Sequence, residues 1–223
     1  MQSETIPNPL KFEKRWPVAL TILIVGILLW FIPERISLLP SWLAYAACII
    51  MLIPIIAIGL TKADPFWLKM EKYILFSFLF LTGVGNFMNL ENLIKDMLYK
   101  SSQIDGLQLL ASSIAVWLIN VLMFSLLYWQ IDRGGPEARQ NNLKKKPDWF
   151  FTQDSAPEEF VPDNWKPVFV DYLYLAYSTS TAFSTTDVIP LNSKSKMLMM
   201  FQSFISLIII VIVGARAINI IGS

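Results

Sequence analysis

Five long stretches of this sequence contain no charged side chain, and they limit what the chain can fold into. They are residues 16–33, 41–60, 73–90, 107–131 and 197–215. A helix needs about 20 apolar residues to cross the hydrocarbon core of a bilayer. Lipid offers no hydrogen-bond partner to a backbone N–H or C=O group, so a spanning segment has to form these hydrogen bonds within itself, as a helix does. The five stretches therefore predict five membrane-spanning helices.

The composition agrees with an integral membrane protein and excludes several kinds of site. Hydrophobic residues make up 55% and charged residues only 16% of the chain, whereas a soluble domain carries about 25% charged residues. There is no histidine, and the one cysteine, Cys48, lies in the second apolar stretch. A structural disulfide, a histidine or paired-cysteine metal site and histidine-based catalysis are therefore excluded within one chain. We expect no cofactor, no enzymatic activity and no nucleic-acid partner, but contact with membrane lipids.

The first half of the chain predicts a peripheral membrane region. A polar N-terminal segment, 1–15, precedes three predicted helices within residues 16–106. Its basic end resembles the start of a signal peptide, but no small-residue cleavage pattern follows, so we expect a retained helix. Residues 61–72 are predicted to be a loop. Residues 91–106 are predicted either to extend the third helix or to form a short helix on the membrane surface.

The second half, residues 107–223, is the predicted pore domain. It begins with an outer helix, 107–131, in which Asn120 lies at mid-membrane; a hydrogen bond to another helix is favoured there over an ion site. A polar segment, 132–166, follows, and its aromatic residues favour an ordered collar at the membrane interface. The lysines at 144–146 in this collar are either solvated charges or a site for acidic lipid headgroups.

A short apolar run beside a long one is the most informative part of this domain. Residues 170–182 are too few to cross a bilayer. A hydroxyl-rich loop, 183–190, and a basic turn separate them from an inner helix, 197–221. A short helix that enters the membrane, a polar turn and a helix that spans are the parts of a pore loop.

The segment from Asp171 to Pro190 resembles the pore helix and filter of potassium channels. An acidic residue opens the pore helix, Thr181 matches the threonine that opens the filter, Asp187 follows the filter, and the proline precedes the inner helix, all without a gap. The resemblance covers only the pore loop and the inner helix. It implies a homotetramer in which each chain supplies one pore loop to a central pore.

The sequence departs from that family at the filter. Ser184 and Thr186 stand where potassium channels have two glycines. Potassium selectivity needs successive carbonyls pointing inward, a backbone shape that glycine adopts most easily. We therefore expect a pore permeable to monovalent cations and not selective for potassium. Asp187 either braces the loop from behind, as the resemblance implies, or faces the ions; bracing is favoured. The predicted filter-like loop comprises Thr181, Ala182, Phe183, Ser184, Thr185, Thr186 and Asp187.

The inner helix carries polar residues at helical spacing, which predicts a stripe that lines the pore. Gly214 is either a gating hinge or a packing glycine, and packing is favoured. Arg216 lies near the end of the helix, and its direction stays open. The predicted pore-lining residues are Gln202, Ser203, Ser206, Ile210 and Gly214.

Basic residues are distributed unevenly between the two sides of the membrane. The N-terminal segment, residues 61–72, the collar and the turn before the inner helix hold fourteen of the 18 lysines and arginines, and the other side holds four. Basic residues gather on the cytoplasmic side of membrane proteins. This predicts a multi-pass protein of the cell membrane with its pore loop on the cytoplasmic face, the opposite of potassium channels.

The predicted fold is thus an all-α membrane protein with five transmembrane helices, one re-entrant pore helix and a pore loop, tetrameric around a central pore. The predicted function is that of a cation-permeable ion channel. The alternative from a different class is a non-conducting membrane scaffold or sensor that keeps a channel-like fold.

Overall fold

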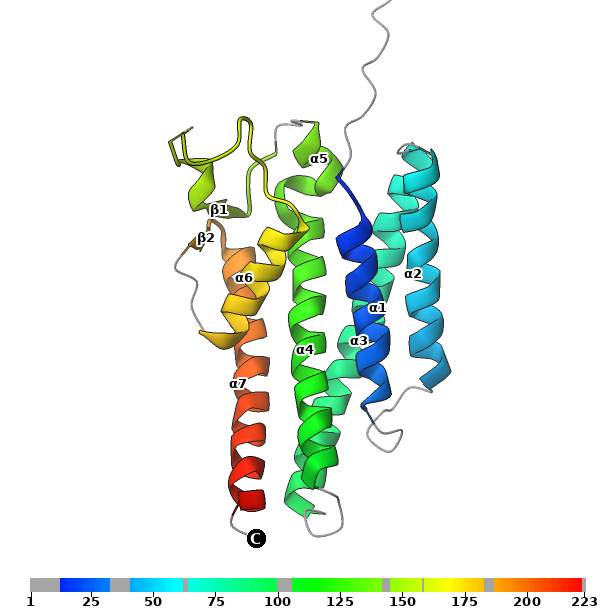
Figure 1. Cartoon of the computed structure of the whole chain (residues 1–223), viewed down its shortest axis with the longest axis vertical. Coiled ribbons are helices and arrows are strands. Elements are labelled where there is room, and N and C mark those ends of the chain that lie inside the picture. Colours follow the sequence, from blue (N-terminus) through cyan, green and yellow to red (C-terminus); the bar gives the residue numbers. More distant parts are fainter. Residues whose placement is uncertain are drawn as a thin grey trace, which may run out of the picture.

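The computed structural model of the chain is a bundle of long helices with short elements gathered at one end (Figure 1). The long helices are α1 (Trp16–Trp30), α2 (Ser41–Thr61), α3 (Pro65–Tyr99), α4 (Gly106–Ile131) and α7 (Ser193–Ile221). The structure describes residues 13–32, 41–61, 64–99, 106–141, 145–157, 159–182 and 187–221.

Four of these helices, α2, α3, α4 and α7, are long and apolar enough to cross a membrane. Helix α1 is apolar but has only 15 residues, a rise of about 22 Å against a hydrocarbon core of about 30 Å. The expected helical membrane fold is therefore confirmed at this coarser level, with four helices of spanning length.

Helix α3 is longer than the sequence pattern suggested. It begins at Pro65, so the loop predicted for residues 61–72 is wrong from that residue onward. Proline is favoured in the first turn of a helix because that turn has no use for its missing N–H, and the Asp64 carboxylate caps the turn by accepting the Phe66 N–H at 2.8 Å. At its other end α3 continues to Tyr99, so the helical extension was the better of the two predictions for this stretch.

Helix α7 also begins earlier than predicted, at Ser193 instead of residue 197. The Asn192 side chain caps it by accepting the Ser195 N–H at 2.9 Å. The supposed basic turn before the inner helix, with Lys194 and Lys196, is therefore the first turn of the helix itself.

The collar and the segment before α7 contain the short elements. They are η1 (Asp132–Gly134), α5 (Pro136–Gln140), β1 (Trp149–Phe151), η2 (Thr152–Asp154), α6 (Phe169–Thr181) and β2 (Val188–Pro190). Strands β1 and β2 pair antiparallel, with Phe150 opposite Ile189. The predicted fold was all-α, so this ladder was not expected. Strands of three residues are too short to show the alternating pattern by which a strand is recognised in a sequence.

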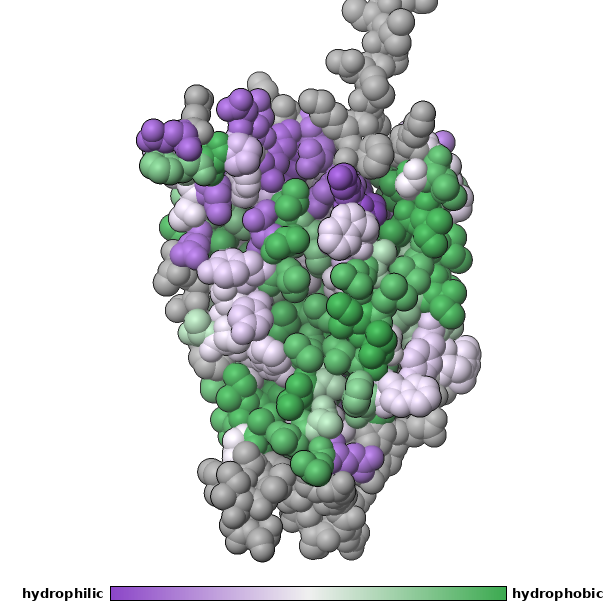
Figure 2. All heavy atoms as spheres, viewed as in Figure 1, coloured by the Kyte–Doolittle hydropathy of each residue, from purple (hydrophilic) through white to green (hydrophobic). Residues whose placement is uncertain are grey.

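Helix α4 is the centre of the bundle. In its most apolar 18-residue stretch 72% of the residues are buried, against 28% for α2, 39% for α3 and 33% for α7. Helices α1, α3, α6 and α7 all pack against it. Hydrophilic residues gather at the collar end, and hydrophobic residues cover the sides of the helices (Figure 2). This distribution is the one expected of a bundle surrounded by lipid.

Candidate functional site

Helix α6 and the chain that follows it form the candidate site. The helix starts at the collar, runs obliquely past α4 and α7 and ends partway along them (Figure 1). The chain then returns through β2 to pair with β1 in the collar. The start of α6 and strand β2 thus lie at the same end of the bundle. Residues 183–186, between α6 and β2 in the sequence, lie outside the described residues.

One face of α6 is buried against α4 and α7. Its buried residues recur three and four apart, as on one side of a helix. They are Phe169, Tyr172, Leu175, Ala176, Thr179 and Ser180. The opposite face, with Tyr174 and Tyr177, is exposed in the single chain.

Gln202 of α7 holds the buried face of α6 in place. Its Nε2 donates to the Ala176 carbonyl and to Ser180 Oγ, both at 2.8 Å. Its Oε1 accepts the Tyr128 hydroxyl of α4 at 2.6 Å. Ser203, one residue on, donates to the Thr179 carbonyl at 3.1 Å. The two side chains together join the inner, outer and short helices.

Gln202 and Ser206 therefore do not lie where a pore-lining stripe was predicted. Both are fully buried within the chain, and Ser206 accepts the Asn120 Nδ2 of α4 at 3.1 Å. This bond confirms the helix–helix role predicted for Asn120. Of the other residues predicted to line the pore, Ser203 is half-buried, whereas Ile210 and Gly214 are exposed. The side chain of Arg216 is outside the described part of the chain.

After the exposed Lys194 and Lys196 of its first turn, the large exposed side chains of α7 are apolar. Those between residues 197 and 211 are Met197, Met200, Phe201, Phe204, Leu207, Ile210 and Val211. The sequence shows the polar residues of this helix, but their spacing does not show which neighbouring element covers them. The hydrogen bonds of Gln202 and Ser206 show that α4 and α6 cover this polar face.

Asp187 is hydrogen-bonded both to α6 and to the collar. Its Oδ2 accepts the Tyr174 hydroxyl of α6 at 2.7 Å, and its carbonyl accepts the Thr152 N–H of the collar at 3.2 Å. The bond to Asp187 raises the pKa of Tyr174 above its ordinary value. This geometry supports bracing as the role of Asp187. Of the predicted filter-like residues, Thr181 is the last residue of α6 and Ala182 is its C-cap, whereas Phe183, Ser184, Thr185 and Thr186 lie outside the described residues.

Asp148 of the collar ties down the chain after β2. Its carbonyl accepts the Leu191 N–H at 2.9 Å and the Ser195 hydroxyl at 2.9 Å. Its carboxylate accepts the Asn192 side chain at 2.7 Å. The collar therefore fixes the returning chain from β2 to the first turn of α7.

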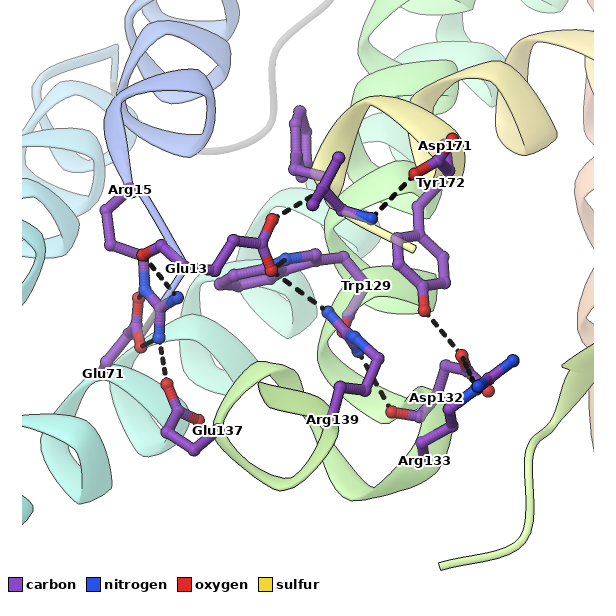
Figure 3. Close-up of polar contacts among 12 residues, drawn as sticks. Glu13, Arg15, Glu71, Trp129, Asp132, Arg133, Glu137, Arg139, Asp171 and Tyr172 are labelled. Carbon is purple, nitrogen blue, oxygen red and sulfur yellow. Dashed lines mark hydrogen bonds and ion pairs between the residues drawn. The ribbon is translucent and has the colours of Figure 1, made fainter. Parts of the chain in front are cut away.

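A buried polar cluster joins the collar to the helices (Figure 3). Asp132, fully buried at the end of α4, accepts the Tyr172 hydroxyl at 2.5 Å and the Asp148 N–H at 2.8 Å. Arg139 of α5 donates to the carbonyls of Trp129 and Asp132 at 2.6 and 3.1 Å. Its guanidinium also lies 4.8 Å from the centre of the Tyr172 ring. The start of α6 is thus held by charged groups that the sequence showed only as part of a polar segment.

Arg15 anchors the end of the N-terminal segment in the same region. It pairs with Glu71 of α3 at 2.8 Å and with Glu137 of α5, and it lies 5.0 Å from the centre of the Trp129 ring. Burial works to lower the pKa of Arg15, but the two carboxylates outweigh it and raise the pKa. The sequence presented this residue as a basic flank of the first helix, and its burial was missed.

The described residues contain no group of three or more acidic, cysteine or histidine side chains that could hold a metal ion. The carboxylates of the cluster are instead used by arginines, a tyrosine and backbone amides. No protein-family model, curated protein or solved structure matches this chain.

Proposed function

We propose that this chain is a subunit of a pore-loop ion channel in the cell membrane. The observation that best supports this proposal is the course of α6. The helix begins at the collar, and the chain after it returns to the collar at β2. With 13 residues it rises about 20 Å, which is less than the hydrocarbon core of about 30 Å. In this proposal α6 is a re-entrant pore helix, residues 183–187 form the pore loop, and α1 joins the four longer helices as a fifth span.

Cations are the proposed permeant ions, because of the direction of α6. The C-terminal end of a helix carries a partial negative charge and free carbonyls, and this end of α6 leads into the hydroxyl-rich loop. Ser184 and Thr186 occupy the places of the filter glycines, so the proposed pore passes monovalent cations without selecting potassium.

Four copies around one axis are proposed because the open face of α6 carries polar groups. Tyr174 and Tyr177 are about half exposed, and Thr181 is exposed as well. Hydroxyl groups at membrane depth need protein or water as partners. Neighbouring subunits and a central water-filled pore supply both.

The alternative of a non-conducting scaffold or sensor also has one specific observation in its favour. The polar side chains of α7 that were expected to line a pore make their hydrogen bonds inside the chain, and the open face of α7 is apolar. Apolar constrictions close channels by excluding water, so this face fits either a closed channel or a protein that never conducts.

Assembly and ion flux test the proposal together. The purified protein is sized in detergent and reconstituted in liposomes, and cation flux is compared between the wild type and Thr181→Trp. Thr181 is exposed at the end of α6, so the indole is expected to obstruct the pore and reduce flux at least tenfold. The matched control is Ile53→Trp on the exposed side of α2, which is expected to leave flux unchanged. A monomer, or equal flux in both variants, would end the channel proposal.

A further inference from the structure

Helix α6 does not provide its own complete N-terminal cap. The first N–H groups of any helix lack partners within the helix. The residue before the first turn is Val168, whose side chain has no acceptor. The Asp171 carboxylate reaches back only to the Val168 N–H, at 2.7 Å. The N–H of Phe169, the first residue of α6, therefore needs an acceptor from elsewhere.

Glu13 of the N-terminal segment is that acceptor, although it lies 156 residues away in the sequence. Its Oε1 accepts the Phe169 N–H at 2.7 Å. Its Oε2 accepts the Trp129 indole N–H at 3.0 Å and lies 3.5 Å from Arg139 Nη2. Figure 3 shows this carboxylate between the indole, the arginine and the start of α6.

The position of Glu13 is fixed from several sides. The residue is only 7% exposed, so its charge has little access to water and depends on the groups around it. Arg15, two residues on, is held by Glu71 and Glu137. The segment of residues 13–15 is thus attached to α3, α4, α5 and α6 at once.

We propose that Glu13 is a positioning residue that caps α6 from outside and sets where this helix sits. A carboxylate is stabilised at a helix N-terminus by the free N–H groups and the partial positive charge there. The other end of α6 leads into the predicted pore loop. A substitution at Glu13 that shifts the start of α6 is therefore expected to shift the residues next to the loop as well. The effect on conduction rests on the proposed channel function, whereas the cap itself does not.

Hydrogen exchange tests the cap without any need for conduction. Glu13→Ala removes the acceptor, and amides in the first turn of α6 are expected to exchange about tenfold faster. Glu13→Gln keeps the shape and one acceptor oxygen but loses the charge, so an intermediate increase is expected, and this variant serves if the alanine variant does not fold. The control is Ser112→Ala, which removes a 3.0 Å bond to the Phe31 carbonyl at the far end of α1. Unchanged exchange in both Glu13 variants would overturn the cap.

Ion flux in liposomes tests the positioning. Per reconstituted tetramer, Glu13→Gln is expected to change flux at least threefold, whereas Ser112→Ala leaves it at the wild-type value. Faster exchange in α6 with unaltered flux would overturn the positioning role and leave Glu13 a structural cap. If the wild type does not conduct, the channel proposal and the positioning role fail together, and exchange alone then decides the cap.

Discussion

At the scale of single residues, most polar side chains near the collar are committed to one another. Asp132 alone accepts hydrogen bonds from Tyr172 and from the backbone of Asp148. A buried polar group without a partner costs about 1–3 kcal/mol, more if it is charged. Asp132 and Tyr172 avoid this cost by bonding to each other.

The pair of Tyr174 and Asp187 makes a prediction about pH. Because the bond to Asp187 raises the pKa of Tyr174, the bond is complete below the ordinary tyrosine value of about 10. Its contribution to stability is lost as the pH rises through the raised pKa. Subtracting the absorbance titration of Tyr174→Phe from that of the wild type isolates the Tyr174 hydroxyl. The substitution Asp187→Asn is expected to return the pKa of Tyr174 toward about 10.

If the Tyr174 hydroxyl titrates alike in the wild-type and Asp187→Asn backgrounds, Asp187 does not hold it and the bracing role is wrong.

At the scale of elements, α6 is held by its neighbours at its start, along its buried face and on its open side. Glu13 binds its start, Gln202 binds its buried face, and Tyr174 links its open side to Asp187 of the returning chain. A helix of 13 residues has little stability of its own in isolation. These contacts therefore decide its position.

Gln202 gives the prediction at this scale. Gln202→Leu leaves the Tyr128 and Ser180 hydroxyls without their partner, so the free energy of unfolding is expected to fall by about 2 kcal/mol. Phe201→Leu, on the exposed side of the same helix, is expected to change it by less than about 0.5 kcal/mol. Denaturant unfolding in detergent, followed by circular dichroism, measures both. Equal stability of the two variants would contradict the structural role of Gln202 and favour the earlier prediction that it lines a pore.

At the scale of the whole molecule, the collar end gathers the segments that hold most of the basic residues. The start of α1, the end of α2, the start of α3, the described part of the collar and the start of α7 lie together there (Figure 1). The positive-inside tendency favours the cytoplasm for this end. This supports the proposed entry of α6 from the cytoplasmic face.

Cysteine labelling tests this orientation. The buried Cys48 is first replaced by serine, and each new cysteine is introduced into this Cys48→Ser background. Lys145→Cys in the collar is expected to escape an impermeant maleimide on intact cells and to react after permeabilisation. Lys95→Cys, exposed toward the other end of α3, is expected to react on intact cells. The reverse pattern would place the collar outside the cell.

Apolar runs and their lengths were sufficient to predict the four helices of spanning length and the shortness of α6, but not that α1 has only 15 residues. The place of Asn120 in the middle of its run predicted a hydrogen bond to another helix, without telling which one. These features follow from local periodicity and from the thickness of a bilayer. The boundaries of α3 and α7 were predicted less well, because charged residues near a helix end look like a loop although they continue the helix.

Only the tertiary structure decided which polar residues face one another. Gln202 and Ser206 have the spacing of a pore-lining stripe, yet their partners lie on α4 and α6. The pairing of β1 with β2 and the bond from Phe169 to Glu13 join residues far apart in the chain. Helical spacing shows which residues share a face, but the hydrogen-bond partners that bury a charge or an amide are set by how the elements pack.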